Sequence, residues 1–283
     1  MRKLCLLALL CISLTQLKAQ NGVVFKIKYL PNHNYQTSVN MNMKLNVNLN
    51  GDTALISKLK SQGITQPVNA NLAIGINGNI KTGALGADNT FPLNMDYKVA
   101  NLTINANGKD VPIPPKATEK DIKIMGHITQ DGKIKIDSAE GKKISDTTEK
   151  KMQQMMDIVQ KQIQFPDRPL KPGDTFTQGA PTNIPISGDN NIQLNGGVTY
   201  KLVSISGGKA YFDMVPNFSL SFKIKTMAIS ITGTGTGKMV YSMKDNFPLS
   251  KDGSFNVRIK VTSNKLNVDG TAFITSNYSC TIN

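Results

Sequence analysis

Residues 35–49 read Tyr-Gln-Thr-Ser-Val-Asn-Met-Asn-Met-Lys-Leu-Asn-Val-Asn-Leu. Every odd position in this stretch is apolar, tyrosine or threonine, and every even position is Gln, Ser, Asn or Lys. An alternation with a period of two predicts a β-strand with one buried face. At about 3.3 Å per residue the strand would extend roughly 50 Å. That length is typical of a curved barrel or half-barrel rather than of an ordinary sandwich.

The same alternation recurs along most of the chain. Between Phe91 and Val99 the apolar residues occupy odd positions, but between Leu102 and Ala106 they occupy even ones, which predicts a β-bulge near Ala100. We therefore expect an antiparallel meander. Its further strands are predicted at 24–30, 68–76, 122–136 (a hairpin), 198–205, 210–215, 218–233, 237–243, 254–262 and 270–282. Residue pairs that tolerate positive φ predict the turns, at 50–51, 77–78, 107–108, 131–132, 195–196, 252–253 and 269–270.

Two amphipathic helices are expected to interrupt the strands. The first spans about 53–62, with Asp52 as its N-cap and Gly63 as its stop. The second spans about 147–164 and carries five apolar residues at helical spacing, so one of its faces must be covered, most simply by the sheet. The predicted fold is mainly β, with long antiparallel strands in a curved sheet or half-barrel and two amphipathic helices.

The N-terminus predicts export. Arg2 and Lys3 precede an apolar run over 4–14, and Leu17-Lys18-Ala19 is a plausible cleavage site, so residues 1–19 are expected to be a cleavable signal peptide. No later stretch approaches the roughly 20 apolar residues of a membrane-spanning helix. The mature chain is expected in the periplasm or outside the cell. Residues 20–164 are predicted to form one β-rich half with the helices, and 165–283 a second half packed with it as one unit.

The chain is basic, with a net charge of +14 that falls to +11 when Arg2, Lys3 and Lys18 leave with the signal peptide. Only Arg168 and Arg258 of the remaining basic residues are arginine, the side chain favoured for phosphate and base-edge recognition. We therefore expect no nucleic-acid partner. The lysines suit an acidic surface such as lipid headgroups or anionic polysaccharide, or they simply keep exposed strand faces soluble.

Residues suited to catalysis or metal binding are scarce. His33 and His127 are the only histidines, and no histidine or cysteine pair stands at ligand spacing. Cys280, the one cysteine after the signal peptide, is expected to be a small buried hydrophobe. Residues 233–238 lack the glycine spacing of a phosphate loop and are expected to form a strand against which another group packs closely. We therefore expect no enzyme, cofactor or metal site, although a Cys280–His127 dyad and a hidden carboxylate pair remain open.

Methionines are the more informative residues. Met41 and Met43 lie in the long predicted strand, and Met152, Met155 and Met156 lie on the second predicted helix. Thioethers serve as adaptable core packing, as contacts for a hydrophobic ligand, or as ligands for Cu(I). Core packing and ligand contact are the readings that suit these amphipathic positions.

The stretch Phe165-Pro166-Asp167-Arg168-Pro169-Leu170-Lys171-Pro172-Gly173-Asp174-Thr175-Phe176 resembles a signature of a family of exported bacterial proteins of unknown function. In that family a helix, a proline-rich loop and a Gly-Asp-Thr/Ser-aromatic step join two β-rich halves. Phe176 stands at the aromatic position, where the family often has tryptophan. The resemblance implies no activity. The expected layout also looks like the periplasmic half-barrel carriers that bind lipid or lipoprotein acyl chains, a likeness of architecture without a shared motif.

The leading hypothesis is a non-enzymatic envelope protein with an apolar binding cleft under its curved sheet. The runner-up is a structural or interaction protein with a closed core, in which an envelope protein partner pairs with a sheet edge. The third is an unrecognised hydrolase. The residues expected to line the cleft and contact a lipid or other hydrophobic ligand are Met41, Met43, Met152, Met155, Met156 and Val159.

Overall fold

A computed structural model describes residues 22–61, 65–114, 122–139, 163–179, 183–187, 190–224 and 226–283. The predicted signal peptide lies outside the described residues. So does the second predicted helix, apart from Ile163 and Gln164, which are described and are not helical. Four of the six predicted ligand contacts, Met152, Met155, Met156 and Val159, therefore lie outside the described residues.

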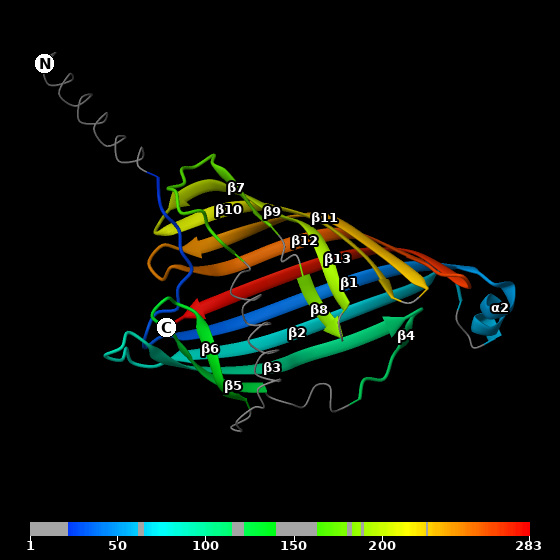
Figure 1. Cartoon of the computed structure of the whole chain (residues 1–283), viewed down its shortest axis with the longest axis horizontal. Helices are drawn as coiled ribbons and strands as arrows, with labels where there is room; N and C mark the ends of the chain where they lie inside the picture. Colours follow the sequence, from blue (N-terminus) through cyan, green and yellow to red (C-terminus); the bar gives the residue numbers. More distant parts are fainter. Residues whose placement is uncertain are drawn as a thin grey trace, which may run out of the picture.

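The described chain forms one large antiparallel sheet, curved and open, which confirms the predicted fold class. The strand order is β6-β5-β3-β2-β1-β13-β12-β11-β10-β9-β7, with β4 paired to β3 and β8 paired to β9 (Figure 1). The elements are β1 (Asn34–Gly51), α2 (Thr53–Ser61), β2 (Val68–Thr82), β3 (Phe91–Ala106), β4 (Lys109–Asp110), β5 (Ile122–Ile128), β6 (Ile134–Ala139), β7 (Thr175–Gly179), β8 (Asn183–Ser187), β9 (Asn190–Ser206), β10 (Lys209–Ile224), β11 (Met227–Ser242), β12 (Phe247–Thr262) and β13 (Leu266–Ile282).

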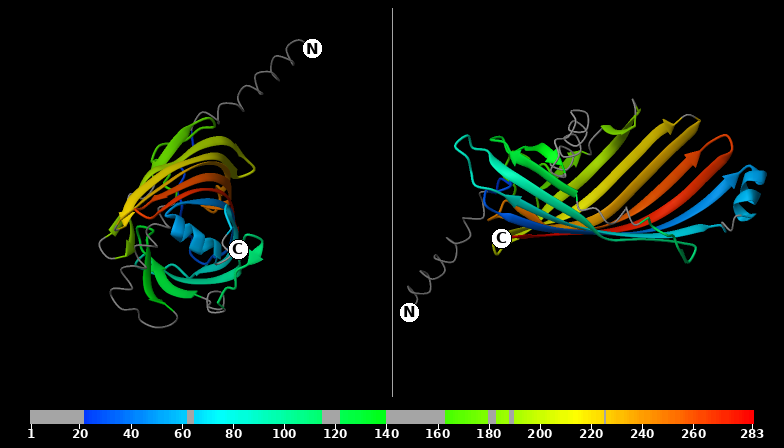
Figure 2. Two further views of the ribbon diagram at one scale, coloured as in Figure 1. Left: turned by 90° about the vertical axis from the view of Figure 1, so that its right-hand side faces the viewer. Right: turned by 90° about the horizontal axis from the view of Figure 1, so that it is seen from below.

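The first and last strands meet in the middle of the sheet, because β1 pairs with β13 along nearly its whole length. The chain then runs outward from β1 to β6 on one side and from β13 back to β7 on the other. Viewed along the strands, the sheet curls around its concave side, with α2 at one end of the trough (Figure 2). Both predicted halves thus contribute to a single sheet, and β6 and β7 end its ordered path.

The alternation in residues 35–49 places one set of side chains on the concave side. Tyr35 is fully buried there, and Val39, Met41 and Met43 follow it on the same face, while the intervening asparagines face the convex side. The capped helix is also as predicted, since the Asp52 carboxylate accepts hydrogen bonds from the backbone N–H groups of Ala54 (2.8 Å) and Leu55 (3.1 Å).

The predicted bulge is present. Gly75 pairs with Asn101 and Ile76 pairs with Val99, so Ala100 is the extra residue in β3. It keeps the apolar residues on both sides of it on the concave face.

Deleting Ala100 is expected to cost less than about 1 kcal/mol of stability, because Val99, Asn101 and Leu102 then alternate without interruption. Deleting Asn42 from the bulge-free β1 is expected to prevent folding. The residues before or after the deletion then shift by one position in the pairing, which turns their apolar side chains to the convex face. Urea unfolding of the two variants, compared with the wild type, measures the loss of stability. Equal losses from the two deletions would contradict the assignment of Ala100 as the extra residue of a bulge.

Four predicted turns are wrong. Gly78, Gly196, Gly253 and Gly270 all lie inside long strands, with their α-carbons on the concave side. A side chain at Gly78 would collide with the Tyr97 ring. The three glycines of residues 233–237 behave in the same way, and Phe218, Phe255 and Met214 occupy the space that their side chains would fill. The sequence marks these glycines as turns because it does not show the side chains and the backbone of neighbouring strands that approach them.

The predicted strand at 24–30 is also wrong. Only Val23 forms a β-bridge, with Leu170, and the rest of the segment crosses the sheet instead of joining it. Lys28 N–H donates to the Asn246 carbonyl at 3.1 Å, and the Tyr241 hydroxyl donates to the Lys26 carbonyl at 2.5 Å. The alternation there arises because Phe25 and its odd-numbered neighbours pack into the core, not because the backbone pairs with a strand.

Two other predicted boundaries are corrected in the second half. Residues 209–224 form the single strand β10, although two strands were expected, since Val215 to Asn217 continue its pairing with β9. The predicted strands 218–233 and 237–243 are instead divided between β10 and β11, because the hairpin turns near Thr226. The glycines at 233–237 suggested a break between strands, so the break was predicted there and the turn near Thr226 was missed.

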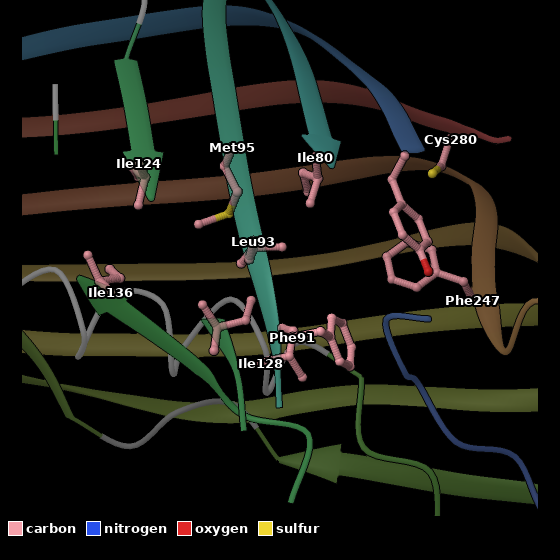
Figure 3. Close-up of a cluster of buried hydrophobic side chains, with 11 residues drawn as sticks. Ile80, Phe91, Leu93, Met95, Ile124, Ile128, Ile136, Phe247 and Cys280 are labelled. Carbon is pink, nitrogen blue, oxygen red and sulfur yellow. The ribbon is translucent and has the colours of Figure 1, made fainter. Parts of the chain in front are cut away.

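The core occupies one end of the trough and consists of two clusters. The first includes Tyr35, Leu93 and Met95 and is drawn in Figure 3. The second includes Phe25, Phe212 and Tyr241. Cys280 is buried in the first cluster, as predicted.

The proline-rich signature belongs to the second cluster. Phe176 stacks on Tyr200 with ring centroids 4.9 Å apart, and the fully buried Leu170 exchanges backbone hydrogen bonds with Val23. Asp174 accepts hydrogen bonds from the Lys171 backbone N–H (2.9 Å) and from the Arg168 guanidinium (3.4 Å). These contacts tie the loop to the N-terminal segment and to β9.

Candidate ligand-binding face

The concave side of the sheet changes character along its strands. In β1 the fully buried Tyr35 shares this side with Met41 and Met43, which are only half-buried. The strands thus continue past the core as an apolar face. We call this part the distal face; it comprises Met41, Met43 and Leu45 of β1, Leu72 and Ile74 of β2, Ile274 of β13, Phe255 of β12 and Phe218 of β10.

Strand register brings these residues together in rows. Met43 stands opposite Leu72 on one side and Ile274 on the other, and Ile274 stands opposite Phe255. Phe255 lies over Gly235 of the next strand. Cross-strand neighbours of this kind lie about 4.5–5.5 Å apart, so the row from Leu72 to Phe255 is a continuous apolar band.

The eight side chains of the distal face are only half-buried. The close contacts of the described strands run between neighbours in the sheet, and α2 contacts β1 at the far end (Figure 1). The predicted contacts Met41 and Met43 lie side by side in this face, where their binding role stays a prediction. Met43 stands between Leu72 and Ile274, and Met41 stands between Ile74 and Ser276. No group of metal-ligating His, Cys, Asp or Glu occurs among the described residues.

Lys251 interrupts the apolar pattern. It lies on the concave side of β12, opposite Tyr278 of β13 and Met239 of β11. Its ammonium lies 5.3 Å from the centroid of the Tyr278 ring. The described ion pairs are His127–Asp137, Lys133–Asp131 and Arg168–Asp174, so no described carboxylate pairs with Lys251. Burial lowers the pKa of this ammonium from 10.5 to about 8.

Three tyrosines lie at the edge of the first core cluster, and one of them, Tyr278, is the cross-strand neighbour of Lys251. Tyr29, Tyr97 and Tyr278 pack against that cluster. Burial, reinforced by the neighbouring Cys280 thiol, raises the pKa of Tyr278 far above its usual range, and burial raises the pKa of Tyr29 and Tyr97 as well. Their hydroxyls therefore remain neutral hydrogen-bond donors at neutral and mildly alkaline pH.

Sequence reasoning missed Lys251. The residue alternates with Gly253, Phe255 and Val257, which is the signal of a charge on an apolar face. The pair Asp252-Gly253 was predicted as a turn, and that placed Lys251 in a loop instead of a strand.

Replacing Lys251 with methionine is expected to stabilise the ligand-free protein by about 2 kcal/mol at pH 7. The difference between the folded pKa of about 8 and the unfolded 10.5 corresponds to roughly 3 kcal/mol, which partial solvent screening reduces. Because the folded pKa is the lower one, the penalty is complete below pH 8 and disappears as the pH rises toward 10.5. Urea unfolding at pH 7 and pH 10.5 measures it. Lys260→Met, on the exposed convex side of β12, is the control, and an equal effect from both variants would contradict the desolvation of Lys251.

Cys280 and His127 lie on opposite sides of the sheet and do not form a dyad. His127 lies on the convex side, where its Nδ1 is 3.0 Å from a carboxylate oxygen of Asp137, whereas Cys280 is buried on the concave side.

A shallow groove of about 430 Å³ also lies on the convex side. Its lining is polar, and the Asn277 amide already donates to the Asp252 carboxylate. No aliphatic or aromatic side chain lines this groove.

Comparisons with known proteins leave the family open. No family model matches the chain, and no curated protein matches it. Among solved structures, the outer membrane protease OmpT from Escherichia coli aligns at 8% identity and a TM-score of 0.17, covering 90% of this chain and 99% of that one. A TM-score this low carries no argument. No helix among the described residues is long and apolar enough to cross a membrane.

Proposed function

We propose that this protein is a non-enzymatic, exported envelope protein that binds a lipid or other hydrophobic ligand on the distal face. The observation that carries the proposal is an apolar concave surface that continues from the core, spans neighbouring strands and keeps its side chains only half-buried. Exposed apolar patches of this kind mark binding sites. The predicted signal peptide supports export, and the resemblance of the proline-rich signature to an exported family agrees with it.

A modest contact area is enough for useful affinity. Covering about 300 Å² of apolar surface on each partner contributes roughly 15 kcal/mol at 25 cal/mol per Å². Association and ordering cost roughly half of that sum. The remainder corresponds to a dissociation constant on the order of micromolar. A single acyl chain is therefore a sufficient ligand.

A titration with N-phenyl-1-naphthylamine, which fluoresces in apolar surroundings, tests the proposal. The mature protein is expected to bind the dye saturably, with a dissociation constant on the order of micromolar. A lysophospholipid below its micellar concentration should displace the dye, whereas glycerol phosphate, which has no acyl chain, should not. Unsaturable or absent binding would refute the proposal.

A further inference from the structure

Lys251 is a charged side chain on an otherwise apolar side of the sheet. Along the strand path from β6 to β7, which leaves out β4 and β8, it is the one charged side chain that the register puts on the concave side. The other lysines of these strands, such as Lys44 and Lys238, alternate with concave residues and face the convex side. A charge on an apolar face is costly unless something pairs with it.

The position of Lys251 divides the concave side into two parts. Its row runs through Val39 and Tyr278 to Met239. Toward one end of the strands the side chains belong to the buried core, and toward the other end they form the distal face. From Lys251 to Val261, β12 extends about 33 Å along that face. The cation thus stands at the inner end of an apolar track, where the polar end of a long molecule would lie.

The surroundings of Lys251 suit an anion. The Tyr278 ring holds one side of the ammonium, and no described carboxylate neutralises it. An incoming anion would therefore gain an unpaired cation that has already lost much of its water.

We propose that the ligand of the distal face is an anionic amphiphile whose headgroup pairs with Lys251 and whose apolar tail lies along Met43, Ile274 and Phe255. This proposal rests on the proposed function and adds to it the charge of the ligand and its orientation. The headgroup lies at the inner end of the track, against the core. The scattered convex lysines do not contact it.

Two lysophospholipids with the same acyl chain test the proposal, because the phosphodiester group of lysophosphatidylglycerol leaves a net negative charge that lysophosphatidylcholine cancels. The affinity of each lipid is measured by its displacement of N-phenyl-1-naphthylamine. Four proteins are compared: the wild type, Lys251→Met, Lys251→Arg and Lys238→Met. The wild type is expected to prefer the anionic lipid by about tenfold. Lys251→Met should bind both lipids equally, Lys251→Arg should keep the preference, and Lys238→Met, on the convex side of the adjacent strand, should match the wild type.

The outcomes separate the two proposals. Dye binding without any preference for the anionic lipid, or a preference that survives in Lys251→Met, would overturn the headgroup site and leave the apolar face intact. Failure of the wild type to bind dye or either lipid would overturn the proposed function itself. A Lys251→Met protein that is less stable than the wild type would show that a carboxylate of this chain already pairs with the lysine, which would also overturn the headgroup site.

Discussion

The Met43→Asp variant is expected to lose binding of N-phenyl-1-naphthylamine by more than about tenfold while remaining folded. Met43 stands in the middle of an apolar row between Leu72 and Ile274, so any ligand on the distal face must cover it. A carboxylate there must be desolvated by the ligand, which costs several kcal/mol. Because Met43 is only half-buried in the free protein, the substitution lowers the stability of the folded protein much less than it lowers the stability of the ligand complex.

Asn42→Asp is the matched control for that variant. It places the same charge on the same strand one residue away, but on the exposed convex side. Its dye binding should equal that of the wild type. If Met43→Asp binds as well as Asn42→Asp, the ligand lies elsewhere. If Met43→Asp fails to fold, the distal face is a closed core, and the structural or interaction hypothesis gains.

The Phe212→Ala variant is expected to lose about 4 kcal/mol of stability. Phe212 is 1% exposed, and its ring lies within 5.3 Å of Phe25, 5.6 Å of Phe165 and 6.5 Å of Phe176, measured between centroids. Its removal leaves a cavity where β10 meets the N-terminal segment and the proline-rich loop.

Phe273→Ala supplies the comparison for this loss, since Phe273 lies on the convex side of β13 and is 43% exposed. It should change stability by less than about 0.5 kcal/mol. Urea unfolding followed by circular dichroism measures both variants. A small loss from Phe212→Ala would contradict the assignment of this end of the trough as the core.

Much of the sheet could be predicted because period-two alternation reports burial of one face. Residues 35–49 predicted β1, and the change of parity around Ala100 predicted its bulge. The alternation does not report what a strand pairs with. The segment around Phe25 alternates for the same reason as β1, yet it crosses the sheet instead of joining it.

The candidate site was less predictable. Met41 and Met43 lie on the apolar face as the pattern indicated, although nothing in the sequence shows whether that face is covered. Lys251 was hidden because Asp252-Gly253 has the composition of a turn. Gly253 lies in a strand because β12 pairs there with Gly237 of β11 and Ser276 of β13, a contact between elements that local sequence does not reveal.

The central claim is that the distal face holds an apolar ligand. Its most direct test is mass spectrometry of organic extracts from the protein purified from its native envelope, with a denatured and washed sample as the control. The account predicts an amphiphile in stoichiometric amount with the wild type and its loss from the Met43→Asp variant. A wild-type extract that contains no more lipid than the washed control would contradict the claim.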